Sequence, residues 1–514
     1  MLLGIDFGTT RTVVAAADRG NYPVVSFQDE NDNPQEWYPS LIAFSGPGAK
    51  LVYGFEAAAR QHDRDWSVIR SFKRDLGTLG PESPVEFGSV PVSALSVLTD
   101  FLVQLRTDLF ERSNLHLTPG EKLEALISVP ANANSNQRYI TLEAFRLAGF
   151  LVKGTLNEPS AAGVEYAHRY RNVGRVAARR EHIVIYDLGG GTFDASVISM
   201  TDQLHEVLSS HGIGRLGGDD FDRILLELAI ESVGIGEISP ETRIILLEEC
   251  REKKEGLHPN TRRVAIDFER ALPGLGEVVV GTSDFYDRCR PLVQKTIDAT
   301  EQALTGATGL DRRSIAAVYM VGGSSDLPIV ARTLRDRYSR LLRRSPYPHA
   351  ATAIGLAIAA DAKAGYEINE RFTRHFGVWR EVESGSSVTM DVIFPKDTRL
   401  PVNGEKLRQI RRYHPTHNLG HFRFAECSRV DEHGHPTGDI TLWEEIFFPF
   451  TAELEYTSDL SAVPVQRTPP KEEIIEEIYS CDEHGIIEVR IVNLSTNHER
   501  ASRLHRVGAA KSAA

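Results

Sequence analysis

Short apolar runs that end in glycine-rich turns alternate with longer amphipathic stretches over residues 1–366, a pattern that predicts a mixed α/β domain. Residues 183–186 are long enough for a buried strand, and Asp187 and three consecutive glycines follow closely. Glycines in series weaken a strand unless something large must approach the backbone. Because the chain then resumes as a strand, we predict a hairpin bend whose bare N–H groups bind phosphate. A glycine hairpin that only turns the sheet is the alternative at this stretch.

The strand–aspartate–turn–strand pattern occurs a second time near the N-terminus. Residues 2–16 contain an apolar run, Asp6, Gly8, two threonines and a further apolar run. Two such units roughly 180 residues apart predict a duplicated fold with two facing lobes. Two more glycine turns, at 217–218 and 322–323, precede helical stretches, and helix N-termini after such turns favour phosphate. Since a carboxylate beside a phosphate repels it unless a metal ion intervenes, the two aspartates predict Mg²⁺.

Amphipathic spacing predicts the helices of this domain. Lys73 and Arg74 follow the first predicted helix as a basic pair, where such charges are often simply solvated. Pro159 stands in the first turn of another helix, where its missing N–H costs nothing, and Glu158 just before it can help to cap that helix. The predicted helices cover residues 57–69, 92–113, 135–150, 159–170, 219–254, 288–306 and 348–365.

From residue 377 onward the chain reads as short alternating strands separated by Gly, Pro, Asn and Asp turns, which is typical of an all-β domain. Residues 367–376 form a charged junction without alternation, and the small, polar residues 503–514 predict a frayed end. Phe422 and Phe424 share one face of a strand. They either line a ligand groove or belong to the core, and same-face aromatics are more often core.

Three histidines in the β-rich part have a spacing that suggests metal ligands: His414, His417 and His421. Pro415 and Gly420 exclude a helix that would bring them together, so we do not expect a zinc site there.

The composition of the chain limits the kinds of partner and compartment that we expect for it. The 514-residue chain has a net charge of −13, which argues against nucleic acid. The basic run at 167–182 lacks an aromatic platform and is better explained as a solvated connection. The chain has only four cysteines, widely spaced and without a C-x-x-C pair, as expected in a reducing compartment. We find no signal peptide and no apolar window long enough for a bilayer, so we expect a cytoplasmic protein without a membrane partner.

Six segments carry a family resemblance: GIDFGTTRT, VPANANSNQR, NEPSAAGVEYA, DLGGGTFDAS, LGGDDFD and VGGSSDLP. They resemble, in the same order, those of the seventy-kilodalton heat-shock chaperones, the heat shock protein 70 family. The resemblance implies an actin-like (ribonuclease H-like, duplicated) two-lobed ATPase domain over residues 1–366. It further implies a linker at 367–376, an all-β sandwich domain for extended apolar peptides at 377–496, and a tail at 497–514 in place of the family's helical lid.

The resemblance also assigns roles in ATP hydrolysis, which requires a held γ-phosphate, neutralised charge and an aligned water. Lys73, in a matching SFKR, would orient the water and contact the γ-phosphate, and Glu158 would be a cleft carboxylate near Mg²⁺. The predicted catalytic group is Lys73, Glu158, Asp187, Thr192 and Asp194. Asp6 and Asp187 would hold Mg²⁺ through water. The residues predicted to bind ATP or ADP are Gly8, Thr9, Thr10, Arg11, Gly189, Gly190, Gly191, Thr192, Gly217, Gly218, Asp219, Lys254, Gly322, Gly323 and Ser324.

The sequence departs from the family at two functional places. Where the family sandwiches adenine between two arginines, this chain has Glu255 and Asp326, and only Lys254 of the adenosine-contacting set is kept. Carboxylates cannot make the cation–π contact, so weaker or less selective adenine binding is expected. The junction also lacks the family's leucine-rich linker, which puts interdomain coupling and a J-domain co-chaperone in doubt. A nucleotide-exchange factor is a further possible partner.

Three other functions stay open. A sugar kinase of the same actin-like superfamily would need a base for an acceptor hydroxyl and would leave the β-domain without a purpose. A nucleotide-gated scaffold would use the β-domain for one dedicated partner. Filament formation, as in actin, is the third.

Overall fold

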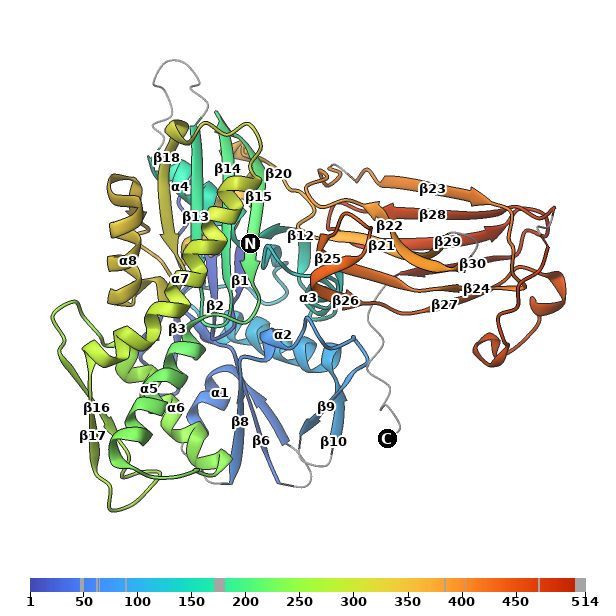
Figure 1. Ribbon diagram of the computed structural model, residues 1–514. Helices are drawn as coiled ribbons and strands as arrows, with labels where there is room; N and C mark the ends of the chain where they lie inside the picture. Colours follow the sequence, from blue (N-terminus) through green and yellow to red (C-terminus); the bar gives the residue numbers. More distant parts are fainter. Residues whose placement is uncertain are drawn as a thin grey trace.

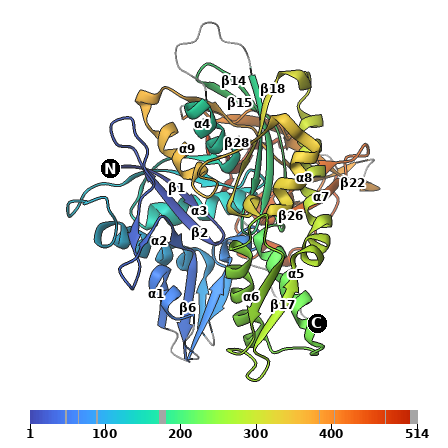
Figure 2. The same ribbon diagram turned by 90° about the vertical axis from the view of Figure 1, so that its left-hand side faces the viewer.

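The computed structural model describes residues 1–46, 50–61, 63, 65–87, 90–170, 181–382, 385–402, 404–469 and 472–503. Two α/β lobes lie side by side, and a separate body of strands lies against the first lobe (Figures 1 and 2). Most of the basic run predicted to be a solvated connection, and most of the predicted frayed end, lie outside the described residues.

The first lobe is built on a five-stranded sheet in the order β12-β11-β1-β2-β5. Strand β1 runs parallel to β11 and antiparallel to β2, with Asp6 at its carboxyl end. Helices α2 and α3 pack against a core of aliphatic and aromatic side chains. The bounds are β1 Leu2–Phe7, β2 Arg11–Ala16, β5 Tyr38–Pro39, β11 Glu124–Val129, β12 Leu151–Asn157, α2 Ala94–Glu111 and α3 Ser135–Leu147.

The second lobe repeats this arrangement in a six-stranded sheet, β19-β18-β13-β14-β15-β20. Strand β13 is parallel to β18 and antiparallel to β14, as β1 is to β11 and β2. The repeated order agrees with the duplicated pattern in the sequence. The bounds are β13 Glu181–Leu188, β14 Phe193–Thr201, β15 Leu204–Ile213, β18 Ile315–Val321, β19 Leu342–Arg344, β20 Glu367–Asn369, α5 Gly218–Val233, α6 Pro240–Glu255, α7 Thr282–Gly306 and α8 Pro328–Tyr338.

Helices α4 (Glu158–Tyr170) and α9 (Ala351–Ala360) pack together between the two sheets. Their small residues allow an approach that larger ones would block. A Cβ on Gly355 would stand 1.8 Å from the carbonyl oxygen of Ala161, and one on Gly4 would stand 2.3 Å from that of Ala353. The two lobes are therefore joined by backbone-to-backbone contact.

Smaller elements extend both lobes at their outer ends. In the first lobe these are β3 Phe27–Gln28, β4 Pro34–Gln35, β6 Leu41–Ser45, β7 Lys50–Tyr53, α1 Gly54–Ala59, β8 Trp66–Arg70, β9 Pro84–Phe87 and β10 Val90–Ser93. In the second they are β16 Arg263–Asp267 and β17 Glu277–Gly281, which pair beside α5 and α6.

The predicted helix over 57–69 is wrong in its second half. Helix α1 ends at Ala59, and residues 66–70 form strand β8, which pairs antiparallel with β6. The polar interruption between them breaks the helical pattern, and the ladder to β6 overrides local helical spacing. The helix predicted over 288–306 is α7, which begins earlier, at Thr282.

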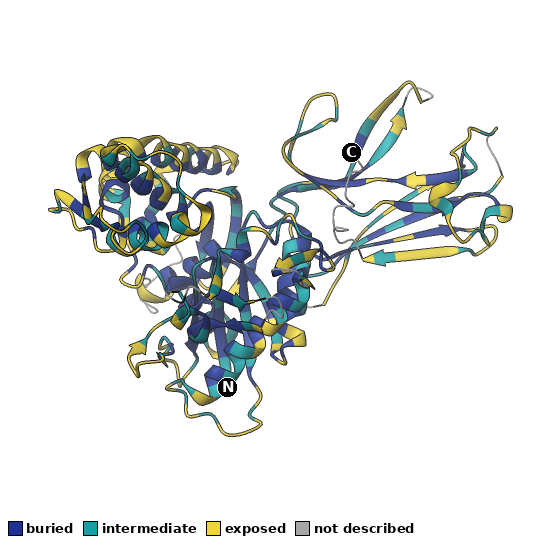
Figure 3. Cartoon of the chain, turned by 90° about the horizontal axis from the view of Figure 1, so that it is seen from below, coloured by how far each residue is buried: buried dark blue, intermediate teal, exposed yellow. Residues whose placement is uncertain are grey.

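The β-rich part consists of two four-stranded sheets, β22-β21-β25-β26 and β23-β28-β29-β30, and the pair β24-β27. Their inner faces enclose a core that contains both Phe422 and Phe424. Figure 3 shows that buried residues gather in the interior of the β-rich part and of the two lobes, whereas exposed residues lie on their outer surfaces. The bounds are β21 His375–Val382, β22 Ser387–Phe394, β23 Leu407–Tyr413, β24 Leu419–Phe422, β25 Phe424–Val430, β26 Pro436–Leu442, β27 Ile446–Pro449, β28 Ile475–Cys481, β29 Ile487–Asn493 and β30 Glu499–Arg503.

Two segments differ from the sequence-based boundaries. Strand β30 extends the sheet into the predicted tail 497–514, because its charged side chains pair across the strands: Arg503 bonds Glu488 at 2.9 Å. The predicted linker 367–376 contributes β20 to the second-lobe sheet and the start of β21 to the β-rich part.

The close contact of α4 with α9 leads to a stability prediction. We expect Gly355→Ala to lower the stability of the chain by about 1–3 kcal/mol, the usual cost of overpacking, because its methyl group would collide with backbone. Thermal unfolding followed by circular dichroism would show a lower midpoint. Gly236→Ala, where an added Cβ meets nothing within 4 Å, is the control. Equal midpoints for the two variants would contradict the prediction.

Candidate functional site

The four predicted glycine turns meet in one cavity of about 980 Å³ between the lobes. The β13–β14 turn is bonded to the start of α5: Gly218 N–H donates to Gly189 O at 3.0 Å, and Asp219 N–H to Gly190 O at 2.8 Å. Of the predicted residues, those that line the cavity are Asp6, Gly8, Thr9, Thr10, Arg11, Lys73, Glu158, Asp187, Gly189, Gly190, Thr192, Gly218, Asp219, Lys254, Gly322, Gly323 and Ser324.

Gly191, Gly217 and Asp194 are not part of the cavity lining, but each lies directly behind it. A Cβ on Gly217 would stand 2.6 Å from the carbonyl carbon of Gly190, and one on Gly191 would stand 2.7 Å from Thr9 Cγ2. These glycines therefore allow the turns to touch. Asp194 is cross-strand neighbour to Asp187 and accepts a hydrogen bond from Asn132 N–H at 3.3 Å.

Carboxylates gather at the floor of the cavity. Asp6 accepts a 2.6 Å hydrogen bond from Ser128 Oγ, and burial together with the charge of Glu158 raises its pKa to about 6. Burial, with the charges of Glu158 and Asp6, also raises the pKa of Asp187 well above its usual range. Burial and Glu158 do the same to the pKa of Asp194. The floor thus holds more negative charge than its own cations balance.

A buried ion pair stands in the middle of this acidic floor. Lys73 Nζ donates to Glu158 Oε1 at 2.6 Å, and the two residues are only 5% and 8% exposed. Burial opposes the charge on Lys73, but Glu158 and Asp6 outweigh it and raise the pKa of the ammonium. The ammonium of Lys73 is therefore fixed and charged beside the glycine turns.

The donor set fits a hydrated divalent cation. The described residues contain no group of three or more His, Cys, Asp or Glu side chains that could grip a metal ion directly. Asp6 and Asp187 nevertheless face one cavity with raised pKa values, so a cation there would relieve their repulsion. Mg²⁺ keeps much of its water shell, so contact through water is its usual mode.

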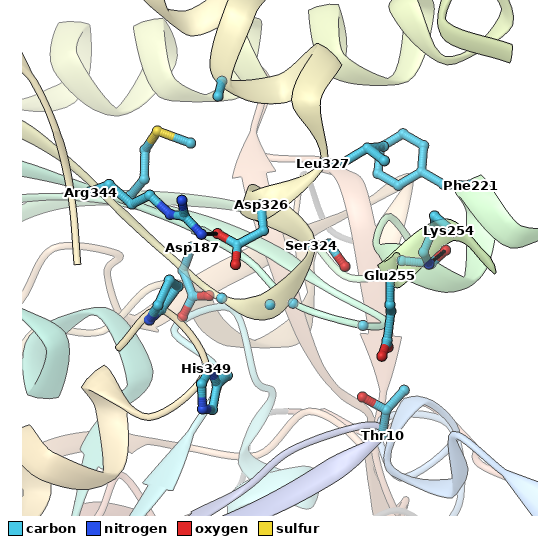
Figure 4. A pocket seen from close by; sticks show the side chains of 18 of the residues that line it. Thr10, Asp187, Phe221, Lys254, Glu255, Ser324, Asp326, Leu327, Arg344 and His349 are labelled. Atoms are coloured by element: carbon cyan, nitrogen blue, oxygen red, sulfur yellow. Dashed lines mark hydrogen bonds and ion pairs between the residues drawn. The ribbon is translucent and has the colours of Figure 1, made fainter. Parts of the chain in front are cut away.

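The outer end of the cavity contains Glu255 and Asp326, and each has an arginine partner. Figure 4 shows the contact of Asp326 with Arg344. Arg11 Nη2 lies 2.5 Å from Glu255 Oε2, and Arg344 Nη2 lies 2.5 Å from Asp326 Oδ1. Guanidinium groups are thus present at this end, although they come from other positions. Sequence analysis missed Arg344, whose signal was the basic run ahead of α9.

Lys254 serves a structural contact as well as lining the cavity. Its ammonium lies 2.7 Å from Asp222 Oδ1 and donates to Gly218 O at 2.8 Å. It therefore fixes the start of α5 beside the glycine turns.

Ion pairs close the cavity between the lobes. Arg70 of the first lobe lies 2.8 Å from Glu248 of α6, and Arg74 lies 3.3 Å from Asp219 of α5. Ser71, in a left-handed conformation at φ 58°, donates to Asp219 at 2.7 Å. Ser71 was not among the predicted residues, and no sequence pattern marks it.

The linker and the β-rich part bind to the first lobe next to the cavity. Asn157, the residue before Glu158, donates from its backbone N–H to Glu370 Oε1 at 2.9 Å. Glu426 of β25 accepts hydrogen bonds from both the backbone and the hydroxyl of Ser135 at the start of α3. Ile486 of the β-rich part packs into the first-lobe core.

The three spaced histidines line a second cavity, of about 930 Å³, in the β-rich part. Phe422 lines it as well and is 4% exposed, whereas Phe424, at 1%, lies wholly in the core. Phe424 therefore belongs to the hydrophobic core only, whereas Phe422 belongs to the core and also lines the cavity.

Comparison with known proteins identifies the family to which the chain belongs. A family model described as "Hsp70 protein" matches residues 2–373. Two curated relatives named "Chaperone protein HscA homolog" are similar: that of Herminiimonas arsenicoxydans is 32% identical over 380 residues, and that of Bordetella petrii is 32% identical over 384. Each match covers 71% of this chain and 58% of the relative. The chain therefore belongs to the Hsp70 family, which confirms the family predicted from the sequence.

The chain spans about three fifths of the length of these relatives. Within the described part of the chain, no helix combines the length and apolar character needed to cross a bilayer.

The arginine-paired carboxylates lead to a prediction on selectivity. We expect ATP and GTP to bind with dissociation constants within about tenfold of each other, since Glu255 and Asp326 cannot stack on a purine and the guanidinium groups of Arg11 and Arg344 are engaged in ion pairs with them. Competition against a fluorescent ADP analogue would measure both. A preference for ATP of about a hundredfold or more would contradict the prediction.

Proposed function

We propose that this chain is an ATP-dependent molecular chaperone in which Mg-ATP binding and hydrolysis between the lobes controls the binding of extended peptide by the β-domain. The observation that carries the proposal is the buried Lys73–Glu158 pair beside Asp6 and Asp187 in a cavity walled by glycine turns. This is the constellation that phosphoryl transfer to water requires: phosphate donors, a cation site and a fixed charge.

The proposal assigns an actin-like fold to the two lobes, with residues 1–366 as the ATPase domain, 367–376 as the linker and 377–496 as the sandwich. The repeated strand order of the two sheets supports the first assignment. Strand β30 supports moving the end of the sandwich to Arg503. A J-domain protein and a nucleotide-exchange factor are proposed partners by family.

Different residues of the chain would bind phosphate, hold the metal ion and position the attacking water. Thr9, Thr10 and the turn from Gly189 to Thr192 would donate to phosphate oxygens, as backbone N–H groups and hydroxyls do. Asp6 and Asp187 would hold Mg²⁺ through water, and the ion would neutralise phosphate charge. Lys73, held by Glu158, would position the attacking water, and Asp194 keeps the floor acidic from behind.

Two polar routes support coupling between the cavity and the β-domain. The first runs from Glu158 to its neighbour Asn157 and on to Glu370 of the linker. The second runs from Asp194 through the backbone of Asn132 to Ser135 and Glu426. Both end on buried carboxylates whose pKa values burial raises, so each depends on its hydrogen bonds staying made.

The linker is held by charges in place of the family's leucines. Arg371 pairs with Glu206 of β15 at 2.7 Å and donates to Asp397 O at 2.9 Å. Arg399 donates to Asn369, and β20 joins the second-lobe sheet. These contacts support coupling in spite of the altered sequence.

A nucleotide-gated scaffold remains the second candidate, favoured by the carboxylates at the base end of the cavity. The two functions differ in whether a client changes turnover.

Removing the central ammonium tests the hydrolytic role. Lys73→Ala should lower ATP turnover by about a hundredfold or more, in the range of a lost positioning group, and leave nucleotide affinity within a few-fold. Single-turnover hydrolysis and calorimetric binding measure the two effects. Lys253→Ala, a half-exposed neighbour of Lys254 on α6, is the control. Undiminished turnover in Lys73→Ala would remove Lys73 from the mechanism.

Client-dependent turnover tests the chaperone proposal as a whole. We expect reduced, carboxymethylated α-lactalbumin, which stays unfolded, to stimulate ATP turnover by about fivefold or more, the lower end of ordinary allosteric coupling. Glu370→Ala should abolish the stimulation by removing the bonds to Asn157, whereas Glu367→Ala, at an exposed residue three positions earlier on strand β20, should keep it. Flat turnover in the unaltered chain would favour the scaffold, and stimulation that survives Glu370→Ala would exclude the linker route.

A further inference from the structure

The cavity of the β-rich part lies between the β21–β22 hairpin and the segment from the end of β23 through β24. Trp379, Leu419, Phe422 and Phe450 supply apolar surface to it. Its volume of about 930 Å³ is enough for several side chains of an extended segment. The composition of the wall decides which segments fit.

Basic side chains dominate the wall. Five arginines and three histidines line the cavity, against a single carboxylate, Glu381, among the described lining residues. The basic residues are Arg380, Arg411, Arg412, Arg423, Arg467, His414, His417 and His421. A wall of this kind differs from the purely apolar groove that the family resemblance implied.

Three of the arginines are anchored by carboxylates that do not line the cavity. Arg380 makes a two-pronged contact with the fully buried Glu477, at 2.8 and 2.5 Å. Arg411 grips Asp391 at 3.0 and 3.1 Å, and Arg412 pairs with Glu476. The carboxylates fix these guanidinium groups in place, and each guanidinium keeps N–H donors that its partner does not use.

Two further arginines of the wall, Arg423 and Arg467, are not fixed by a close ion pair among the described residues. Arg423 is exposed and has no carboxylate partner among the described residues. Arg467 and His417 share Glu381, each at the long distance of 3.5 Å. The hydroxyl of Thr468, which also lines the cavity, is buried and has no hydrogen-bond partner in the described part of the chain.

We propose that this cavity binds extended peptide segments in which an apolar residue is flanked by aspartate or glutamate. The inference rests on the proposed function, because it names the client class of the β-domain. The apolar floor takes the central side chain, and Arg423 and Arg467 pair with the flanking carboxylates by charge-assisted hydrogen bonds. Strand β23, paired with β28 alone in its described sheet, offers an open edge for the peptide backbone.

Charge complementarity favours an acidic peptide over nucleic acid. The chain as a whole carries a charge of −13, so a long polyanion would be repelled away from this one cavity. A short acidic segment confined to the cavity meets only its basic wall.

The test compares three labelled peptides that share a leucine centre and differ in their flanks, which are glutamate, glutamine or lysine. Binding to the full chain is followed by fluorescence anisotropy. We expect the glutamate peptide to bind about tenfold more tightly than the glutamine peptide, and the lysine peptide to bind most weakly. The advantage of the glutamate peptide should shrink at about 0.5 M salt.

Charge reversal at the wall provides the matched comparison. Arg423→Glu should weaken the glutamate peptide by about tenfold or more and strengthen the lysine peptide. Arg270→Glu, at an exposed arginine of the second lobe that does not line the cavity, should change neither. Because Arg423 is exposed and unpaired, its replacement leaves the core intact, which equal thermal midpoints would verify.

Each remaining outcome is decisive. Equal binding of the glutamate and glutamine peptides, or an unaffected Arg423→Glu, overturns the acidic preference while peptide binding by the β-domain stands. Absence of binding by all three peptides overturns peptide binding itself. Tighter, Arg423-dependent binding of single-stranded oligothymidine would overturn the peptide class in favour of nucleic acid.

Discussion

Negative charge gathered at the floor of the cavity is the constraint on which the candidate nucleotide site depends. Asp6, Asp187 and Glu158 line the floor of the cavity and Asp194 lies behind it, and burial with mutual repulsion raises the pKa values of the three aspartates. An arrangement of this kind is unfavourable by itself. A divalent cation in the cavity, together with the fixed ammonium of Lys73, would offset the repulsion between these carboxylates. The fold therefore favours a cation beside the glycine turns.

The same constraint ties the floor of the cavity to the rest of the chain. Glu158 begins α4, its neighbour Asn157 holds the linker, and the loop before α3 joins Asp194 to Glu426. Glu158 and Asp194 are therefore each joined, through neighbouring residues, to the linker or to the β-rich part. Because α4 and α9 meet backbone to backbone, side-chain adjustment cannot relieve an added methyl group at this contact between the lobes.

Replacement of apolar contacts by ionic ones recurs outside the nucleotide site. The junction at 367–376 is held by Glu370 and Arg371, and the cavity of the β-rich part is walled by arginines. Buried polar contacts are strong only while every group has its partner, so they specify one docked arrangement more narrowly than apolar packing does.

The amino-acid sequence alone determined the local features: the two strand–aspartate–turn units, the glycine turns ahead of α5 and α8, and the family. Each depends on neighbouring residues, so local patterns report it. Only tertiary structure decided that residues 66–70 form a strand, that Glu255 and Asp326 meet Arg11 and Arg344, and that five arginines share one cavity. These facts depend on partners distant in the chain, and pairing over such separations overrides local preference.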